Sequence, residues 1–489
     1  MPRAPAMNLT AARVLQATVG NGLRLGLAAV TTVLIARTLQ PEGRGLYAMI
    51  VATATISIVA GHLSVTKSQI ALWQDTSRHR ALTGNGLILG LLTGGVSALL
   101  TFVGTTLFAP GTAPGALGTA LLAVPFGVAA INLTGILSLQ SRTGLASQGV
   151  VLSALVLSLP VLTMAVTGHL TVSSAVVCWA ASTTAPLVLF AWSLGPAALR
   201  GDVALARGQL SLSGRYHIGL VAQHLLLTAD TFLLKIFVST AEVGLYAAAG
   251  AFMALAWVPT DAIAQVVMGR QAAGDEEAAQ EATARAIRFS LLLSSAVTAA
   301  LAVASPVLIP LLYGTAYTGS IRPLLLLAPG AVALALIRPA EQYLVRLGRP
   351  MSMTALPAGA LLLNLALNAV LIPRWGASGA ATSSSLSYAA LAAAEVLWFA
   401  RTAGIGTRAL LPRAEDLRSL FSLLSLLPGA GRVLRPAGRA GDGGAVTGRA
   451  RTGEVSSGAR GRGEHVLVAA DAAPAGLQEA QREAAFPEE

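Results

Sequence analysis

Five polar or charged residues lie inside apolar segments long enough to cross a membrane. Arg24 is near the middle of the first such segment, and Asn21 precedes it by three residues, so both share one helix face. Asp230 is near the middle of the seventh segment, and Arg338 and Glu341 stand three residues apart on the tenth. A charge at the centre of a membrane helix costs about 2.5 to 3.5 kcal/mol on insertion scales, so it usually faces a cavity or a partner. These five are therefore the candidate functional residues.

Their side chains favour ligand and ion binding over covalent chemistry. Asn21 and Arg24 form a polar, cationic patch suited to a phosphate-bearing ligand, because guanidinium groups bind phosphate through charge-assisted hydrogen bonds. We expect Arg24 and Asp230 to face a space between two halves of the protein. Arg338 and Glu341 share a helix face and can equally neutralise one another as an ion pair. The histidines lack the nearby Cys or acidic residues of a metal site, so we expect no metal and no cofactor.

The composition is that of a membrane protein. Of 489 residues, 54% are hydrophobic and 11% are charged, against about 25% charged in a soluble domain. The apolar residues come in runs of roughly 20, the length that crosses a ~30 Å hydrocarbon layer as a helix. The pattern predicts an all-α protein with twelve spans, at 14–35, 46–66, 82–108, 116–137, 149–167, 172–194, 216–238, 244–268, 287–312, 323–345, 353–372 and 377–400.

The distribution of charge predicts an orientation. An even number of spans puts both termini on one side, and the loops on that side carry most of the Lys and Arg, which makes both termini cytoplasmic. The net charge of +11 is accounted for by these loops and the tail, so nucleic acid is not an expected partner. No cleavable signal peptide is expected, so the first span should be retained. The preference for Arg over Lys, with abundant Ala and Gly, is typical of a GC-rich bacterial genome.

The chain divides into four parts. We predict a six-helix bundle over 1–199, a cytoplasmic linker over 200–215, a second six-helix bundle over 216–400 and a disordered cytoplasmic tail over 401–489. The sequence GDEEAAQEATARAIR before the ninth span predicts a short surface helix that adjoins that span. The Gly, Ala and Arg of the tail cannot bury a core, although AEDLRSLFSLLSLL over 414–427 is compatible with a helix lying on the membrane surface.

A short repeat relates the two predicted bundles. Gly-Leu-Tyr-Ala occurs at 45–48 and again at 244–247, each time where the first and second spans of a half are joined. Six spans separate the copies, so the repeat is parallel, and Arg24 and Asp230 lie in equivalent spans. Two pseudo-symmetric bundles around a central cavity form an architecture for alternating access, in which the bundles rock about a site near the midplane.

Several segments resemble the polysaccharide or oligosaccharide flippases of the multidrug/oligosaccharidyl-lipid/polysaccharide (MOP) exporter superfamily. The segments are ARTLQPEGRGLYAM, TADTFLLKIFVSTAEVGLYAAAGAF, PLLYGTAYTGSIRPLLLLAPG, EQYLVRLGRP and NLALNAVLIPRWGASGAA, and the similarity runs from about residue 10 to residue 400. The resemblance implies the two-bundle fold shared with the multidrug (MATE-like) transporters. It also implies export of undecaprenyl-diphosphate-linked oligosaccharide across the bacterial cytoplasmic membrane, without ATP hydrolysis and with ion coupling in some relatives.

This resemblance assigns roles to the five residues. Arg24 matches a first-span arginine of many members, so Asn21, Arg24 and Arg338 become candidate contacts for the diphosphate. Asp230 and Glu341 become candidates for ion coupling. The expected partners are the lipid-linked oligosaccharide, membrane lipids and glycan-assembly proteins.

Other functions are compatible with a polytopic membrane protein. The main alternative is a MATE-like drug or small-molecule antiporter, in which Asp230 or Glu341 takes up and releases a coupling proton. A membrane-embedded glycosyltransferase or polymerase would need acidic residues in a sizeable external loop. The predicted outer loops are short, and Glu42 and Glu242 are almost their only acids, so we expect no enzyme. A purely structural scaffold in a glycan-assembly complex is a further alternative.

Overall fold

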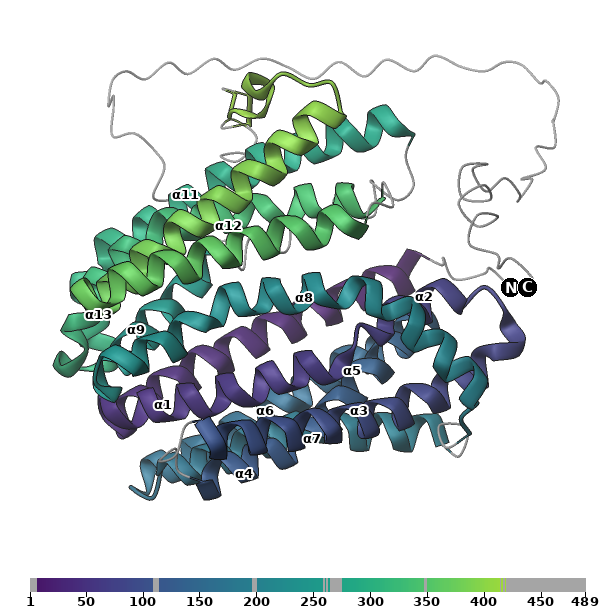
Figure 1. The fold of residues 1–489 in the computed structure, drawn as a ribbon, viewed down its shortest axis with the longest axis horizontal. Helices are drawn as coiled ribbons and strands as arrows, with labels where there is room; N and C mark the ends of the chain where they lie inside the picture. Colours follow the sequence, from purple (N-terminus) through teal and green to yellow (C-terminus); the bar gives the residue numbers. More distant parts are fainter. Residues whose placement is uncertain are drawn as a thin grey trace, which may run out of the picture. The chain divides into compact units, whose positions relative to one another are not determined.

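The structure is a computed structural model that describes residues 7–108, 114–195, 200–257, 260, 263, 275–346, 350–413, 415, 416 and 418. Within these ranges the side chains of 7–21, 215–216, 345–346 and 350–353 are not described. The described regular elements are all helical (Figure 1). The α-helices are α1 (Met7–His62), α2 (Val65–Leu72), α3 (His79–Phe108), α4 (Pro114–Leu122), α5 (Val124–Leu139), α6 (Thr143–Val166), α7 (Val172–Leu194), α8 (Val203–Phe237), α9 (Thr240–Met253), α11 (Glu276–Tyr313), α12 (Ile321–Arg346) and α13 (Pro350–Thr402). Short 3-10 helices are η1 (Thr76–Arg78), η3 (Ala254–Ala256), η4 (Thr315–Ser320) and η5 (Thr407–Leu410).

Two of the longest helices each contain a sharp reversal. α1 is interrupted at Gln40 (φ 56°) and α13 at Gly376 (φ 54°), and Figure 1 shows each of these two helices turning back on itself. At Gly376 a Cβ would lie 2.1 Å from the carboxylate of Glu242, which accepts a hydrogen bond from the Ala377 backbone N–H at 3.0 Å. Glycine is therefore favoured there by the positive φ, and a larger side chain would in addition displace the Glu242 carboxylate.

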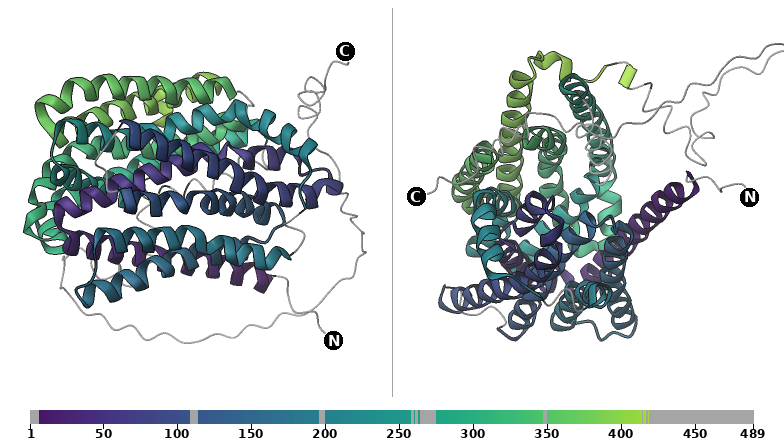
Figure 2. Two further views of the ribbon diagram at one scale, coloured as in Figure 1. Left: turned by 60° about the horizontal axis from the view of Figure 1, so that its bottom comes forward. Right: turned by 90° about the vertical axis from the view of Figure 1, so that its right-hand side faces the viewer.

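The helices agree with the predicted spans. In the described part, nine helices are long and apolar enough to cross a membrane, and α9 with η3 forms a shorter apolar helix. Two of the nine are the reversing helices, which supply two crossings each and bring the total to eleven. The described part of the remaining predicted span, 244–268, is α9 with η3. The long helices run roughly parallel to one another in Figure 1 and in the left view of Figure 2. The chain is therefore a multi-pass membrane protein.

The helices pack as two bundles. In the first bundle, α1 packs with α3, α5, α6 and α7. In the second, α13 packs with α8 and α12, and α12 packs with α11. Separate apolar cores fill the first bundle, around Val128 and Leu133, and the second, around Leu226 and Tyr343. The largest core cluster instead joins Ala36 and Met49 of α1 to residues of α9, α11, α12 and α13. The two bundles are thus held together by apolar contacts along α1.

The two copies of the Gly-Leu-Tyr-Ala repeat contact each other in this interface between the bundles. A Cβ at Gly45 would lie 2.0 Å from the carbonyl oxygen of Thr240, and a Cβ at Gly244 would lie 1.9 Å from that of Pro41. Side chains larger than hydrogen are excluded at both positions, because the obstructing atoms belong to backbone. The Tyr317 hydroxyl also donates to the Ala36 carbonyl at 2.9 Å. The repeat therefore marks a close backbone approach of the two bundles.

The segment predicted as a linker is helical from Val203 and continues into the seventh span without a break. Asp202 caps this helix by accepting from the Leu205 N–H at 2.9 Å. Asn85 of α3 donates to the Asp202 carbonyl at 3.0 Å and to the Gln209 side chain at 2.9 Å. The first turns of α8 are thus docked onto the first bundle. The helix predicted before the ninth span is confirmed, since α11 begins at Glu276 and runs through that span.

The beginning of the predicted disordered tail is folded. η5 follows α13, and the Arg288 guanidinium donates to the Asp416 carboxylate at 2.9 Å and to the Ala409 carbonyl at 3.0 Å. Both charged side chains are about nine-tenths buried. The expectation of disorder from residue 401 is therefore wrong for these residues, because a buried arginine on α11 requires a partner. Most of the predicted surface helix over 414–427 lies outside the described residues.

We predict that Gly45→Ala destabilises the protein by about 1 to 3 kcal/mol, because a methyl group there overlaps backbone that cannot retreat without separating the bundles. Thermal unfolding of the purified protein in detergent measures the effect. Gly26→Ala, also in α1, is the matched control, since a Cβ there would meet nothing within 4 Å. Equal melting temperatures for the two variants would contradict the proposed contact.

Candidate substrate and ion sites

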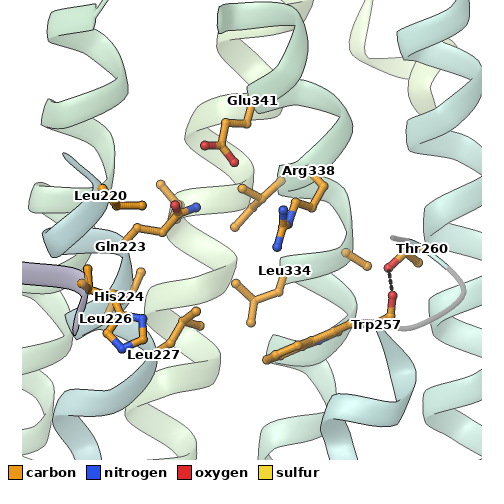
Figure 3. A pocket seen from close by; sticks show the side chains of 14 residues that line it. Leu220, Gln223, His224, Leu226, Leu227, Trp257, Thr260, Leu334, Arg338 and Glu341 are labelled. Atoms are coloured by element: carbon orange, nitrogen blue, oxygen red, sulfur yellow. Dashed lines mark hydrogen bonds between the residues drawn. The ribbon is translucent and has the colours of Figure 1, made fainter. Parts of the chain in front are cut away.

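A cavity of about 390 Å³ opens in the second bundle between α8, α12 and α13 (Figure 3). Most of its wall is apolar, with Val59 of α1 reaching it from the first bundle. Polar groups come from both sides: Gln223 and His224 on α8, Arg338 and Glu341 on α12. The apolar lining includes Leu220, Leu226, Leu227, Trp257, Leu334, Ala335, Ile337 and Leu391. An apolar cavity with a few convergent polar groups is the usual form of a small-molecule site.

Arg338 and Glu341 were predicted to share a helix face, and the structure places both in this cavity. Figure 3 shows the guanidinium and the carboxylate directed into the same space, with His224 on the opposite wall. Two further polar atoms, His224 Nε2 and Trp257 Nε1, are buried without a hydrogen-bond partner among the described residues. Buried polar groups are normally satisfied by protein, water or ligand. The cavity therefore offers donors to a polar ligand in addition to its charges.

Arg24 lines a different cavity, of about 410 Å³, which belongs to the first bundle. Its walls come from α1, α5, α6 and α7, and include hydroxyls of Thr134, Ser153 and Thr183. The Arg24 side chain is partly exposed. Asn21 belongs to α1, but its side chain lies outside the described part of the structure, so the predicted Asn21–Arg24 patch stays a prediction. Arg24 and Arg338, the two arginines expected to contact the diphosphate, thus line separate cavities, one in each bundle.

Asp230 does not face a space between the bundles, and that expectation is wrong. Its side chain is 1% exposed and lies within the second bundle among α9 and α13. The Tyr246 hydroxyl donates to Oδ2 at 2.6 Å, the Asn368 amide donates to Oδ1 at 2.6 Å, and the Ser384 hydroxyl donates to Oδ2. The reason is chemical: three donors supplied by neighbouring helices can satisfy a carboxylate inside a bundle without water.

Further polar residues extend this buried cluster. Asn368 also donates to the Asn364 amide oxygen at 2.9 Å, and Ser383 donates to the Asn364 backbone carbonyl at 3.1 Å. Asn368 Oδ1 has no hydrogen-bond partner among the described residues, so one buried amide oxygen remains available. A carboxylate with nearby amide and hydroxyl oxygens is the ligand chemistry that hard cations prefer. The cluster can therefore hold a proton or a small cation.

Sequence reasoning missed Tyr246, Asn364, Asn368 and Ser384. Two signals were present: the spacing Asn364-x-x-x-Asn368 places both amides on one helix face, and Tyr246 is the tyrosine of the second Gly-Leu-Tyr-Ala. Lys235 is exposed and donates to the Thr240 hydroxyl at 2.6 Å, so it belongs to neither cavity.

The repeat gives a residue-by-residue comparison of the bundles. The offset from Gly45 to Gly244 pairs Arg24 with Gln223, and both line the cavity of their own bundle. The same offset pairs Asp230 with Thr31, whose buried hydroxyl donates to the Ser158 hydroxyl at 2.8 Å. Arg24 and Asp230 therefore lie on equivalent helices but at different positions along them. The carboxylate cluster has no charged counterpart at Thr31.

No protein-family model and no curated protein matches the sequence. Solved structures do match. The structure of lipid II flippase MurJ in an inward closed conformation has a TM-score of 0.67 and 14% identity, covering 84% of this chain and 91% of that chain. An inward-facing MATE family multidrug resistance transporter of the MOP superfamily has a TM-score of 0.59 and 15% identity, covering 79% and 98%.

A third match is a mutant form of the Vibrio cholerae MATE transporter VcmN, with a TM-score of 0.55 and 14% identity over 80% of this chain and 98% of that chain. These chains match almost along their whole length, so the similarity extends across both bundles. The protein therefore has the two-bundle, all-helical fold of the MurJ and MATE transporters.

Proposed function

We propose that this protein exports an undecaprenyl-diphosphate-linked oligosaccharide across the bacterial cytoplasmic membrane by alternating access, for surface polysaccharide biosynthesis. The observation that carries the proposal is the cavity of the second bundle, where the Arg338 guanidinium lies within a largely apolar wall. A diphosphate attached to a hydrocarbon tail has the complementary chemistry, since the anion pairs with the guanidinium and the tail favours apolar surroundings. The solved flippase of the same fold is named for lipid II.

The two cavities suggest how the headgroup is handed between bundles. Arg24, with Asn21 on the same helix face, provides a cation on the first bundle, and Arg338 provides one on the second. Because the cations lie on different bundles, relative rotation of the bundles changes their separation and hence their joint affinity for a diphosphate. A transported ligand must bind tightly enough to enter and weakly enough to leave. A site whose two arginines lie on different bundles meets both requirements, because its affinity changes when the bundles move.

Asp230 is the proposed coupling site. Its three hydrogen-bond donors satisfy the carboxylate when no cation is bound, and the free amide oxygen of Asn368 can complete the ligand set when a cation enters. Both states are therefore stable inside the bundle, as coupling requires. The occupant is a proton or a sodium ion. Glu341 is the second coupling candidate, because it lies in the same cavity as Arg338.

A MATE-like antiporter of drugs or small molecules is the second candidate function. The observation that favours it is Glu341 on the cavity wall opposite His224, since a carboxylate in an apolar wall attracts organic cations. The two functions differ in a deletion strain. Altered drug resistance with intact surface polysaccharide supports the antiporter, and loss of surface polysaccharide supports the flippase.

We predict that Arg338→Ala and Arg24→Ala each reduce export of undecaprenyl-diphosphate-linked oligosaccharide about tenfold or more, because each removes a charge-assisted hydrogen bond to phosphate worth ~1.5 to 3 kcal/mol. The measurement is movement of a fluorescent lipid-linked oligosaccharide in reconstituted vesicles. Arg338→Lys should retain part of the rate by keeping the charge. Arg374→Ala is the control, since that arginine is exposed and donates to the Val370 carbonyl. Wild-type rates in both cavity variants would reject the substrate assignment.

We predict that Asp230→Asn abolishes the dependence of transport on an ion gradient, while leaving binding of the lipid-linked substrate intact. Vesicles with an imposed sodium gradient and vesicles with an imposed pH gradient identify the coupling ion. Tyr246→Phe, which removes one hydrogen bond to Asp230, should weaken the ion dependence. Tyr47→Phe, its repeat equivalent, is the control, because the Tyr47 hydroxyl makes no hydrogen bond among the described residues. Unchanged gradient dependence in Asp230→Asn would exclude this site.

A further inference from the structure

Gln223 of α8 and Trp257, which directly follows η3, are cavity residues to which the proposed transport cycle has given no role. Both line the cavity of the second bundle, and Figure 3 shows the amide and the indole ring extending into it from different sides. Both residues are partly exposed, so a ligand in the cavity can reach them. They add an amide and a large aromatic ring to a wall that is otherwise mostly aliphatic.

The Trp257 ring is positioned by backbone hydrogen bonds on both sides of its Cα atom. The Trp257 N–H donates to the Ala254 carbonyl at 3.2 Å, and the Thr260 hydroxyl donates to the Trp257 carbonyl at 2.8 Å. An indole has a flat face with negative π density. The C–H bonds on one side of a sugar ring form a flat, slightly positive surface that complements this face. A flexible hydrocarbon tail has no such surface, so a tryptophan in the wall favours a sugar over the tail.

The Gln223 amide makes no hydrogen bond among the described residues. An amide both donates and accepts, as sugar hydroxyls do, whereas an ionised phosphate oxygen only accepts. The repeat pairs Gln223 with Arg24 of the first cavity. The second bundle thus keeps a hydrogen-bonding side chain at this position without the positive charge, which favours a hydroxyl where the first bundle favours a phosphate.

Arg338 and Glu341 determine which part of a substrate lies beside these two residues. If Arg338 contacts the diphosphate, the sugar attached to it is the part within reach of Gln223 and Trp257, because all of them line one cavity. The volume of about 390 Å³ lies near the lower end of the ~300 to 1,000 Å³ of ligand pockets, which suits one sugar ring beside the diphosphate. An ionised Glu341 repels any sugar that carries a carboxylate.

We propose that Trp257 and Gln223 form a sugar subsite, in which the C–H face of a neutral sugar ring next to the diphosphate stacks on Trp257 and its hydroxyls bond to Gln223. This inference rests on the proposed function, because it concerns the same cavity and specifies the substrate further. A site that hydrogen-bonds a hydroxyl discriminates against a ligand that lacks it, since the polar group of the protein is then left unpaired. Trp257 and Gln223 are therefore specificity-determining residues.

The test is binding of two probes to the full-length protein in detergent, by isothermal titration calorimetry. One probe is farnesyl diphosphate esterified with glucose, and the other is farnesyl diphosphate esterified with methanol, so the two carry the same charge and differ in the sugar. Wild type should bind the glucosyl probe on the order of tenfold more tightly than the methyl probe. Trp257→Leu and Gln223→Leu should each lose most of this preference. Both variants should bind the methyl probe as wild type does, which also shows that they are folded.

A third probe separates the two contacts. It carries a tetrahydropyran ring in place of glucose, so it keeps the ring and lacks the hydroxyls. Trp257→Leu should still weaken binding of this probe, whereas Gln223→Leu should not. Trp192→Leu in α7 and Gln148→Leu in α6 are matched controls, because both residues are exposed and line neither cavity.

The sugar subsite is overturned if wild type binds the glucosyl and methyl probes equally, or if both cavity variants keep the full preference for the glucosyl probe. A glucuronosyl probe that binds as tightly as the glucosyl probe would contradict the assignment of a neutral sugar. Failure of the proposed function looks different: Arg338→Ala then binds all the probes as well as wild type does.

Discussion

The structure depends on the close backbone crossing of α1 and α9 at Gly45 and Gly244. Every other contact between the bundles near this end has to accommodate the distance that these glycines set. The largest apolar cluster assembles around the crossing, and the Tyr317 and Glu242 hydrogen bonds close over it. The obstructing atoms are carbonyl oxygens rather than flexible side chains, so the neighbouring atoms cannot make room for a larger side chain without moving the backbone. A joint of this kind suits a protein that alternates between two discrete arrangements of rigid bundles.

The two bundles follow one plan but contain different chemistry. Each begins with a helix that reverses or breaks near the Gly-Leu-Tyr-Ala sequence, and each encloses a cavity near its first helix. The first bundle places an arginine and several hydroxyls there. The second places an arginine and the Glu341 carboxyl group in its cavity and, deeper in the bundle, the Asp230 cluster. Acidic groups that can titrate or bind cations are thus concentrated in one half of a symmetric scaffold.

Hydropathy was sufficient to predict the fold, because the length and apolarity of each span are properties of single segments. The spans, their number and the helix leading into the ninth span agree with the structure. Local patterns could not predict which way a polar residue faces inside a bundle. Asp230 was expected between the bundles because burying a charge is expensive, but Tyr246 on the next helix and Asn368 and Ser384, both far away in sequence, offset that cost. The fold after residue 401 was missed for the same reason, since the partner of Asp416 is a distant arginine on α11.

If Asp230 is the coupling site, as proposed above, the absence of a charged counterpart at Thr31 limits the work available from each transport cycle. If one monovalent cation moves with each substrate, a membrane potential of 100 mV contributes about 2.3 kcal/mol per cycle, equivalent to a concentration ratio of roughly fifty. A duplicated carboxylate would have doubled that work and required two ions to be released each time. Under the proposed coupling through Asp230, the divergence at this one pair of positions would give each turnover a modest thermodynamic drive and a single ion-release step.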